Sequence, residues 1–186
     1  VDVSNYGNSN TPRYGRMSLS GHPSNSNDGV FDAYIQSDQG GNFNLSTSVI
    51  PNEDEWYHLA LVINPSDTSI RYYVNGSEET SRTDFDTTHT FTGTRNWQLG
   101  SISTAEAYHS FEGYLDEFAV WSTALTSTQI DSIYNSGDGG VRANEVESTS
   151  LEMYVNFEDE TSTDIINDYS ASQSSRTAIT TNTPFD

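Results

Sequence analysis

The chain has 186 residues, 27 of them acidic and seven basic, and a formal net charge of −20 at pH 7. All basic residues are arginines, so lysine chemistry is excluded, and the absence of cysteine excludes thiol nucleophiles, disulfides and cysteine-bound zinc. Such negative charge excludes nucleic acid as a partner and opposes adhesion to anionic membranes. No apolar run reaches the roughly 18 residues that a membrane helix needs, so we expect no membrane insertion.

The first 55 residues read as short strands between polar turns. Residues 1–13 are rich in Asn, Ser and Gly, and we predict a loop there. Aromatic and β-branched residues then predict strands, separated by Gly- and Asn-rich turns, at 14–20, 30–36 and 42–49.

The clearest pattern lies between residues 56 and 76. Residues 56–63 are an almost continuous apolar run, which indicates a strand that is buried from Trp56 onward. The NPSDTS segment at 64–69 is typical of a turn, and residues 70–74 alternate as a second strand. Asn75-Gly76 is a hairpin signal, and the polar and acidic residues 77–90 are predicted to cross the surface.

Further strands and one helix are predicted in the second half. Thr126 and Gln129 form a capping box for a helix at 126–136, with Gly137 after it. Strands are predicted at 91–100, 114–121, 151–157 and 177–181. Together these patterns predict an all-β protein, a two-sheet antiparallel sandwich or jelly roll with one short helix, in which residues 1–186 form a single domain.

Several motifs occur in a characteristic order: WYHLALV, IRYYVNG, WQLGS, and FEGYLDEFAVW running into ALTSTQIDSIY. In this order they resemble the laminin G-like, concanavalin A-like lectin/glucanase superfamily, which implies the jelly-roll sandwich. The segment SLEMYVNFEDETSTDIINDYSASQ resembles the opening strand of such domains, although it lies near the end of this chain. Residues 142–186 therefore either close the sheet, mark a permuted domain, or belong to an adjacent repeat.

The resemblance also implies a structural calcium site. Family members use the Asp of the "LDE" strand, here Asp116, with acids near residues 157–160. Calcium takes about six to eight oxygen ligands, which carboxylates and carbonyls supply. The expected metal ligands are therefore Asp116, Glu158, Asp159 and Glu160. The alternative is that Asp116 pairs with an arginine or caps a turn.

Two other groups of residues are candidates for binding. An aromatic platform for a sugar ring could be formed by Tyr6, Tyr14, Trp97, Tyr108 and His109, because sugar C–H groups pack on aromatic faces. The alternative is that Trp97 lies in the core and the others fill loops. The acidic segments 25–32 and 53–55 are read as solvated loops, with a cation site as the alternative, and His58 as a buried, hydrogen-bonded histidine.

No strand carries the alternating pair of carboxylates that a retaining glucanase needs, and no G-x-S-x-G or H-E-x-x-H motif occurs. We therefore expect a non-catalytic module, stabilised by calcium, that binds glycans or attaches to a particle or cell surface, outside the cell or on a phage virion. Two alternatives stay open: a purely structural decoration subunit without glycan affinity, and a cryptic glycoside hydrolase. A homo-oligomer is compatible with the binding module and with the decoration subunit.

Overall fold

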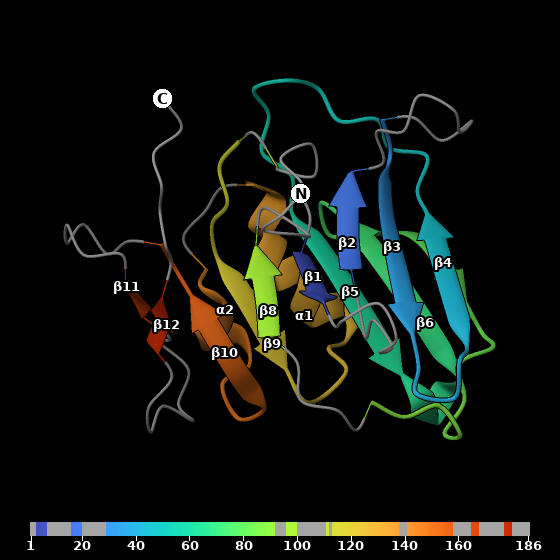
Figure 1. Ribbon diagram of the computed structural model, residues 1–186. Coiled ribbons are helices and arrows are strands. Elements are labelled where there is room, and N and C mark those ends of the chain that lie inside the picture. The colour runs from blue at the N-terminus through green and yellow to red at the C-terminus, as the bar shows by residue number, and fades with distance from the viewer. Residues whose placement is uncertain are drawn as a thin grey trace. The chain divides into compact units, whose positions relative to one another are not determined.

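The computed structural model describes residues 3–6, 16–19, 29–91, 96–99, 111, 113–137, 141–157, 165–167 and 177–179 (Figure 1). Antiparallel strands dominate, with only two short α-helices in the described part, so the predicted all-β jelly-roll class is confirmed. The chain forms two compact units, residues 1–113 and 114–186. The single-domain organisation and the role of residues 142–186 stay predictions. No helix in the described ranges is long and apolar enough to cross a membrane.

One sheet of residues 1–113 has five antiparallel strands. Their order across the sheet is β4 (Asn42–Ser46), β3 (Phe31–Gln36), β2 (Arg16–Leu19), β1 (Val3–Tyr6) and β8 (Asn96–Leu99). The prediction of a loop over residues 1–13 was wrong for β1, because this polar segment pairs on both sides, with β2 and with β8. Backbone hydrogen bonds to both neighbours hold this segment as a strand, although its side-chain pattern does not predict one.

The second sheet of this unit contains β5 (Leu59–Asn64), β6 (Ser69–Val74) and β7 (Ser77–Arg82). The predicted turn is a 3₁₀ turn at Pro65–Asp67, where the Asn64 side chain accepts a hydrogen bond from the Ser66 amide at 3.1 Å. Asn75 and Gly76 both have positive φ, as a tight hairpin turn requires. Within the surface crossing predicted for residues 77–90, the structure adds a strand that was not predicted, because this turn brings the polar β7 back alongside β6.

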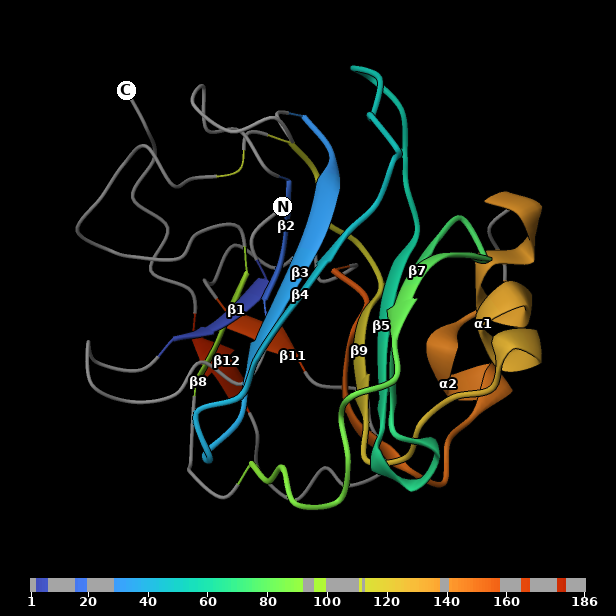
Figure 2. The ribbon, with the colours of Figure 1, turned by 90° about the vertical axis from the view of Figure 1, so that its right-hand side faces the viewer.

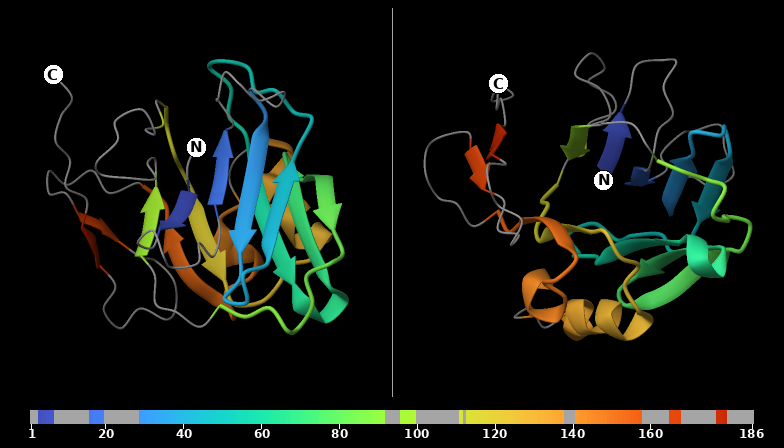
Figure 3. Two further views of the ribbon diagram at one scale, coloured as in Figure 1. Left: turned by 45° about the vertical axis from the view of Figure 1, so that its right-hand side comes forward. Right: turned by 90° about the horizontal axis from the view of Figure 1, so that it is seen from below.

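The two sheets face each other, with β3 and β4 opposite the β5–β7 sheet (Figures 2 and 3). Burial alternates along β3 and β4, so every second side chain points into the space between the sheets. The fully or almost fully buried core comprises Phe31, Ala33, Ile35, Phe43, Leu45, Ile70, Tyr72, Val74 and Phe85. Aromatic rings fill much of this core, which compensates for the low hydrophobic content of 33%.

Residues 114–186 have their own small core. Strand β9 (Phe118–Trp121) pairs with β10 (Leu151–Val155), and β11 (Ile165–Asn167) pairs with β12 (Thr177–Ile179). Ala143, Leu151 and Tyr154 pack with Ala119 and Trp121. The Trp121 indole N–H donates to the Glu147 carbonyl at 2.8 Å.

Helix α1 (Ser127–Tyr134) begins with the predicted capping box of Thr126 and Gln129. It ends earlier than expected, because Asn135 takes the left-handed conformation at φ 46° and a 3₁₀ turn, Asn135–Gly137, follows. A second, one-turn helix, α2 (Ala143–Val146), was not predicted, and it is formed where Ala143 packs into the small core.

The aromatic end of the larger core gives a stability prediction. Phe85 is completely buried, and its ring lies 5.0 Å from that of Phe43, 5.2 Å from that of His89 and 5.6 Å from that of Phe91, between centroids. We expect Phe85→Ala to lower the free energy of unfolding by about 3–5 kcal/mol, because it leaves a cavity among these rings. Urea unfolding measures the change.

Phe91→Ala is the control. Phe91 stacks on Phe85 but is 38% exposed, so its loss leaves a smaller cavity. Equal losses of stability in the two variants would contradict the packing described for Phe85.

Candidate functional site

Two large apolar side chains are exposed on one loop between β4 and β5. Ile50 is 68% exposed and Trp56 is 66% exposed, although most of the other large apolar side chains described in residues 1–113 are buried or partly buried. We call residues 50–57 the Trp56 loop. The expectation that Trp56 begins a buried strand was wrong, because an acidic turn at residues 53–54 precedes it and β5 starts only at Leu59.

The Tyr57 hydroxyl organises the Trp56 loop. It accepts a hydrogen bond from the Asn52 backbone N–H at 3.0 Å and donates one to Glu55 Oε2 at 2.9 Å. The Asn52 side-chain amide donates to the same Glu55 oxygen at 3.0 Å. The Tyr57 ring packs against Phe31 of β3, with 5.2 Å between centroids, which ties the loop to the core. The loop is therefore already ordered before a ligand contacts Trp56, so binding does not have to pay for ordering it.

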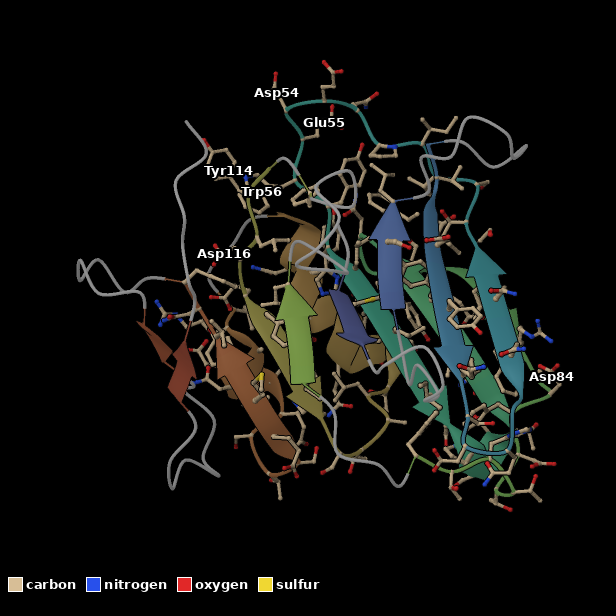
Figure 4. The ribbon with its side chains drawn as sticks, in the orientation of Figure 1. Asp54, Glu55, Trp56, Asp84, Tyr114 and Asp116 are labelled. Atoms are coloured by element: carbon tan, nitrogen blue, oxygen red, sulfur yellow. The ribbon has the colours of Figure 1, made fainter. Side chains whose placement is uncertain are left out.

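The Trp56 loop is negatively charged. Glu53, Asp54 and Glu55 directly precede Trp56, and all three are exposed. Figure 4 labels Asp54, Glu55 and Trp56 on this loop. Hydrogen bonds from Asn52 and then Tyr57 lower the pKa of Glu55 below its ordinary value, because they stabilise the ionised carboxylate. Trp56 thus follows directly on three exposed acidic residues, and hydrogen bonds favour the ionised form of one of them, Glu55.

The exposed part of the Trp56 ring is a surface on which a sugar can pack. An exposed indole packs against the C–H face of a pyranose, and carboxylates at its edge accept hydrogen bonds from hydroxyls. A general acid for glycoside cleavage needs a raised pKa. Among the described carboxyls, those with a shifted pKa, namely Glu55, Asp67, Asp84 and Asp86, are all shifted downward.

The predicted metal ligand Asp116 lies just before β9, at the end of the β9–β10 ribbon. It is exposed, and its Oδ1 accepts a hydrogen bond from the Glu117 amide at 2.9 Å. Phe118 pairs with Val155, so the chain enters β9 at the end of the ribbon where it leaves β10. The remaining predicted ligands, Glu158, Asp159 and Glu160, lie outside the described residues.

A hydrogen bond holds the side chain of Glu117, the residue that follows Asp116. The buried Tyr154 hydroxyl donates to Glu117 Oε2 at 2.6 Å, and burial, aided by Glu117, raises the pKa of Tyr154, so it stays a donor. Glu117 adopts a left-handed φ of 53°. Within the described ranges, no three His, Asp or Glu side chains are grouped to hold a metal ion. The assignment of Asp116 as a metal ligand therefore stays a prediction.

The predicted aromatic platform is only partly covered by the structure. Tyr6 lies in β1 opposite Asn96, and Trp97 lies in β8 opposite Asn5. Tyr14, Tyr108 and His109 lie outside the described residues, so the platform stays a prediction. Sequence reasoning missed two exposed aromatics, Trp56 and, in the second unit, Tyr114, which is 85% exposed. The signal available for Trp56 was the acidic turn directly before it.

The other sequence-based expectations have simple outcomes. His58 is half-buried, its amide donates to Asn75 Oδ1 at 2.9 Å, and burial lowers its pKa. The acidic segment 53–55 is exposed, as a solvated loop would be. Of the segment 25–32, residues 25–28 lie outside the described part.

The loop geometry predicts a pH-dependent stability. Because the pKa of Glu55 is lowered in the folded state, its hydrogen bonds stabilise the protein above its unfolded-state pKa, roughly 4, and this contribution is lost as pH falls through the lower folded-state value. We expect Tyr57→Phe to unfold at a lower temperature than the wild type near neutral pH. The difference in unfolding temperature between the variant and the wild type should narrow as Glu55 becomes protonated. Thermal unfolding from about pH 7 to about pH 3 measures this difference.

Tyr34→Phe is the matched control. The Tyr34 hydroxyl donates to Asn42 Oδ1, a neutral acceptor, at 2.8 Å, so its deficit should not change with pH. A Tyr57→Phe deficit that is equally independent of pH would show that the ionised Glu55 does not stabilise the loop.

Comparison with known proteins places this geometry in a family. The family model of the concanavalin A-like lectin/glucanases superfamily matches residues 6–131. A putative carbohydrate binding protein from Bacteroides ovatus is similar over 90% of this chain, with 19% identity and a TM-score of 0.62. A native heptameric SAP-like pentraxin from Limulus polyphemus is similar over 72% of it, with 20% identity and a TM-score of 0.53.

The chain spans 48% of the Bacteroides protein and 62% of the pentraxin, and at these identities the likeness shows the fold. No curated protein matches the chain. Because the family model covers well over half of the residues, the chain belongs to the concanavalin A-like lectin/glucanase superfamily, of the laminin G-like kind.

Proposed function

We propose that this protein is a non-catalytic glycan-binding module and that the Trp56 loop contacts the sugar. The observation that carries this proposal is a tryptophan that is 66% exposed on a hydrogen-bonded loop. The exposed part of such a ring is a surface on which the C–H groups of a sugar can pack.

The comparisons support a binding role in general. One structural neighbour is described as a putative carbohydrate binding protein, and the superfamily description includes lectins as well as glucanases.

We also propose a structural calcium ion, held by Asp116 together with Glu158, Asp159 and Glu160. The net charge of −20 favours cation binding, and the start of β9 lies at the end of the ribbon from which the acidic run continues. When bound, calcium would neutralise these carboxylates and connect residues 158–160 to β9. The hydrogen bond between Tyr154 and the Glu117 side chain would restrain the residue next to Asp116.

For the location we propose an extracellular or virion surface, where the glycan or protein that is bound belongs to a cell or particle. The high density of negative charge supports this, since salt screens such self-repulsion and an acidic surface stays hydrated. A decoration subunit without glycan affinity is the alternative outcome of the binding experiment below.

Replacing the exposed indole tests the glycan-binding site. We expect Trp56→Ala to lower the affinity for a bound oligosaccharide by about tenfold, because the stacking surface is lost. A glycan array would identify the oligosaccharide, and isothermal titration calorimetry would measure its affinity for both proteins.

Ile50→Ala is the control, since it removes an equally exposed apolar side chain from the same loop without removing a ring. Its effect on affinity should be smaller. If the wild type binds no glycan, the proposed function is wrong and the decoration subunit is favoured.

Calcium addition tests the metal site. A ligand that binds only the folded state raises its stability, so millimolar calcium should raise the unfolding midpoint by several degrees relative to EDTA. Asp116→Asn should abolish this rise, whereas Asp131→Asn, an equally exposed acid on α1, should retain it. Differential scanning calorimetry measures the midpoints, and a wild type that responds equally to calcium and EDTA would overturn the site.

A further inference from the structure

The turn between β6 and β7 contains a pair of residues that can react with each other. Val74 pairs with Ser77, so Asn75 and Gly76 alone make the turn, and both have positive φ, 50° and 78°. The sequence contains an Asn-Gly pair only at this position. In such a pair the backbone nitrogen of the second residue can attack the asparagine side-chain amide with little hindrance, because glycine has no Cβ to shield its nitrogen.

Asn75 extends the pairing of β5 with β6 through its side chain. Leu59 pairs with Val74, so the next pair along the two strands is His58 with Asn75. The Asn75 backbone N–H donates to the His58 carbonyl at 2.8 Å, as in an ordinary antiparallel pair. The His58 backbone N–H, however, donates to Asn75 Oδ1 at 2.9 Å, so a side-chain oxygen takes the place of a backbone carbonyl. We call these two hydrogen bonds the His58–Asn75 pair.

We propose that Asn75 is a site of spontaneous deamidation and that the His58–Asn75 pair controls its rate. In this reaction the Gly76 nitrogen gives up its proton to water and bonds to Asn75 Cγ. The bond from Cγ to the side-chain nitrogen breaks, and that nitrogen takes up a proton and leaves as ammonia. Water then opens the succinimide ring and yields aspartate or isoaspartate at position 75. No oxidant, reductant or cofactor is needed.

The fold opposes closure of the succinimide ring in two ways. Bringing Asn75 Cγ to bonding distance of the Gly76 nitrogen moves the side-chain oxygen away from the His58 N–H, which then loses its acceptor. Ring closure also changes the torsions of a two-residue turn whose ends are fixed by the pairing of β6 with β7. The reaction therefore requires this end of the sheet to open, so it is slower in the folded protein than in the unfolded chain.

The two products affect the strand pairing differently. An aspartate keeps an oxygen at the same place, and its carboxylate can accept the His58 N–H. An isoaspartate carries the main chain through Cβ and Cγ, which lengthens the backbone of the turn and removes the side-chain oxygen. The His58–Asn75 pair is then lost. Because His58 directly follows Tyr57, this loss occurs beside the residue that holds the Trp56 loop.

The test follows the conversion of Asn75 by mass spectrometry. Because the chain has no lysine, trypsin cleaves after Arg71 and Arg82 and releases residues 72–82, in which Asn75 is the only side-chain amide. The full chain is incubated at mildly alkaline pH, once folded and once unfolded in guanidinium chloride, and isoaspartyl methyltransferase labels the isoaspartate that forms. We expect the conversion to be at least about tenfold slower in the folded protein, because the hydrogen bonds of the His58–Asn75 pair must first open.

Low concentrations of guanidinium distinguish local from global opening in the folded protein. Opening of one turn exposes little surface, so the conversion rate should rise only slightly below the unfolding transition. A rate that rises in parallel with the globally unfolded fraction would show that the His58–Asn75 pair does not control the reaction.

Two variants serve as controls. Gly76→Ala places a methyl group beside the attacking nitrogen, so it should slow the conversion in the unfolded chain, where the strain of alanine in the turn has no effect. Asn75→Asp supplies the aspartate product directly. Protein enriched in isoaspartate by incubation in the unfolded state should, after refolding, unfold at a lower temperature than Asn75→Asp, which differential scanning calorimetry measures.

The outcomes separate the parts of the proposal. Slow conversion in the folded protein and fast conversion in the unfolded chain support it. Equal rates in the two states overturn the control by the His58–Asn75 pair, and no conversion in the unfolded chain, or a rate that Gly76→Ala leaves unchanged, overturns the site itself. An isoaspartate form as stable as Asn75→Asp overturns the role of the pair in stability. None of these results depends on glycan binding, so the proposed function is tested separately.

Discussion

The ring of Tyr57 connects the core of residues 1–113 with the surface that we propose to bind sugar. One face of the residue belongs to the interior, because its ring packs on Phe31, while its hydroxyl holds Asn52 and Glu55. The position of Trp56 therefore depends, through its neighbour Tyr57, on the packing of the core between the two sheets. A loop held in this way loses little conformational freedom on binding, which is what a shallow site needs, since it can offer only a small contact area.

The core of residues 1–113 is built largely from aromatic side chains. With hydrophobic residues at 33% of the chain, the sandwich is filled by rings, and Phe43, Phe85 and His89 form its aromatic end. The His89 ring edge lies against Phe43, and its Nδ1 is 2.9 Å from Ser37 Oγ, so even this polar ring is used for packing. Acidic residues can then occupy the surface almost without restriction. The core is thus aromatic, while the acidic residues lie on the surface, where a ligand can meet their charge.

The two candidate sites differ in how far sequence reasoning could reach them. Asp116 was found through a motif that resembles a known family, and the structure adds the Tyr154–Glu117 hydrogen bond beside it. Trp56 was missed, because an aromatic residue at the start of an apolar run looks like the first residue of a buried strand. In the structure Asp54 has a left-handed φ of 62°, β5 starts only at Leu59, and Trp56 lies exposed in the loop between them.

The sequence by itself determined the all-β class, the hairpin at Asn75-Gly76 and the capping box at Thr126, since each follows from local periodicity or from side chains that bond to their own backbone. The tertiary structure alone decided that β1 and β7 are strands and that Trp56 is exposed. The physical reason is that pairing of a polar strand depends on a neighbouring edge, and exposure depends on what covers a side chain. Both partners are distant in sequence, so no local pattern contains them.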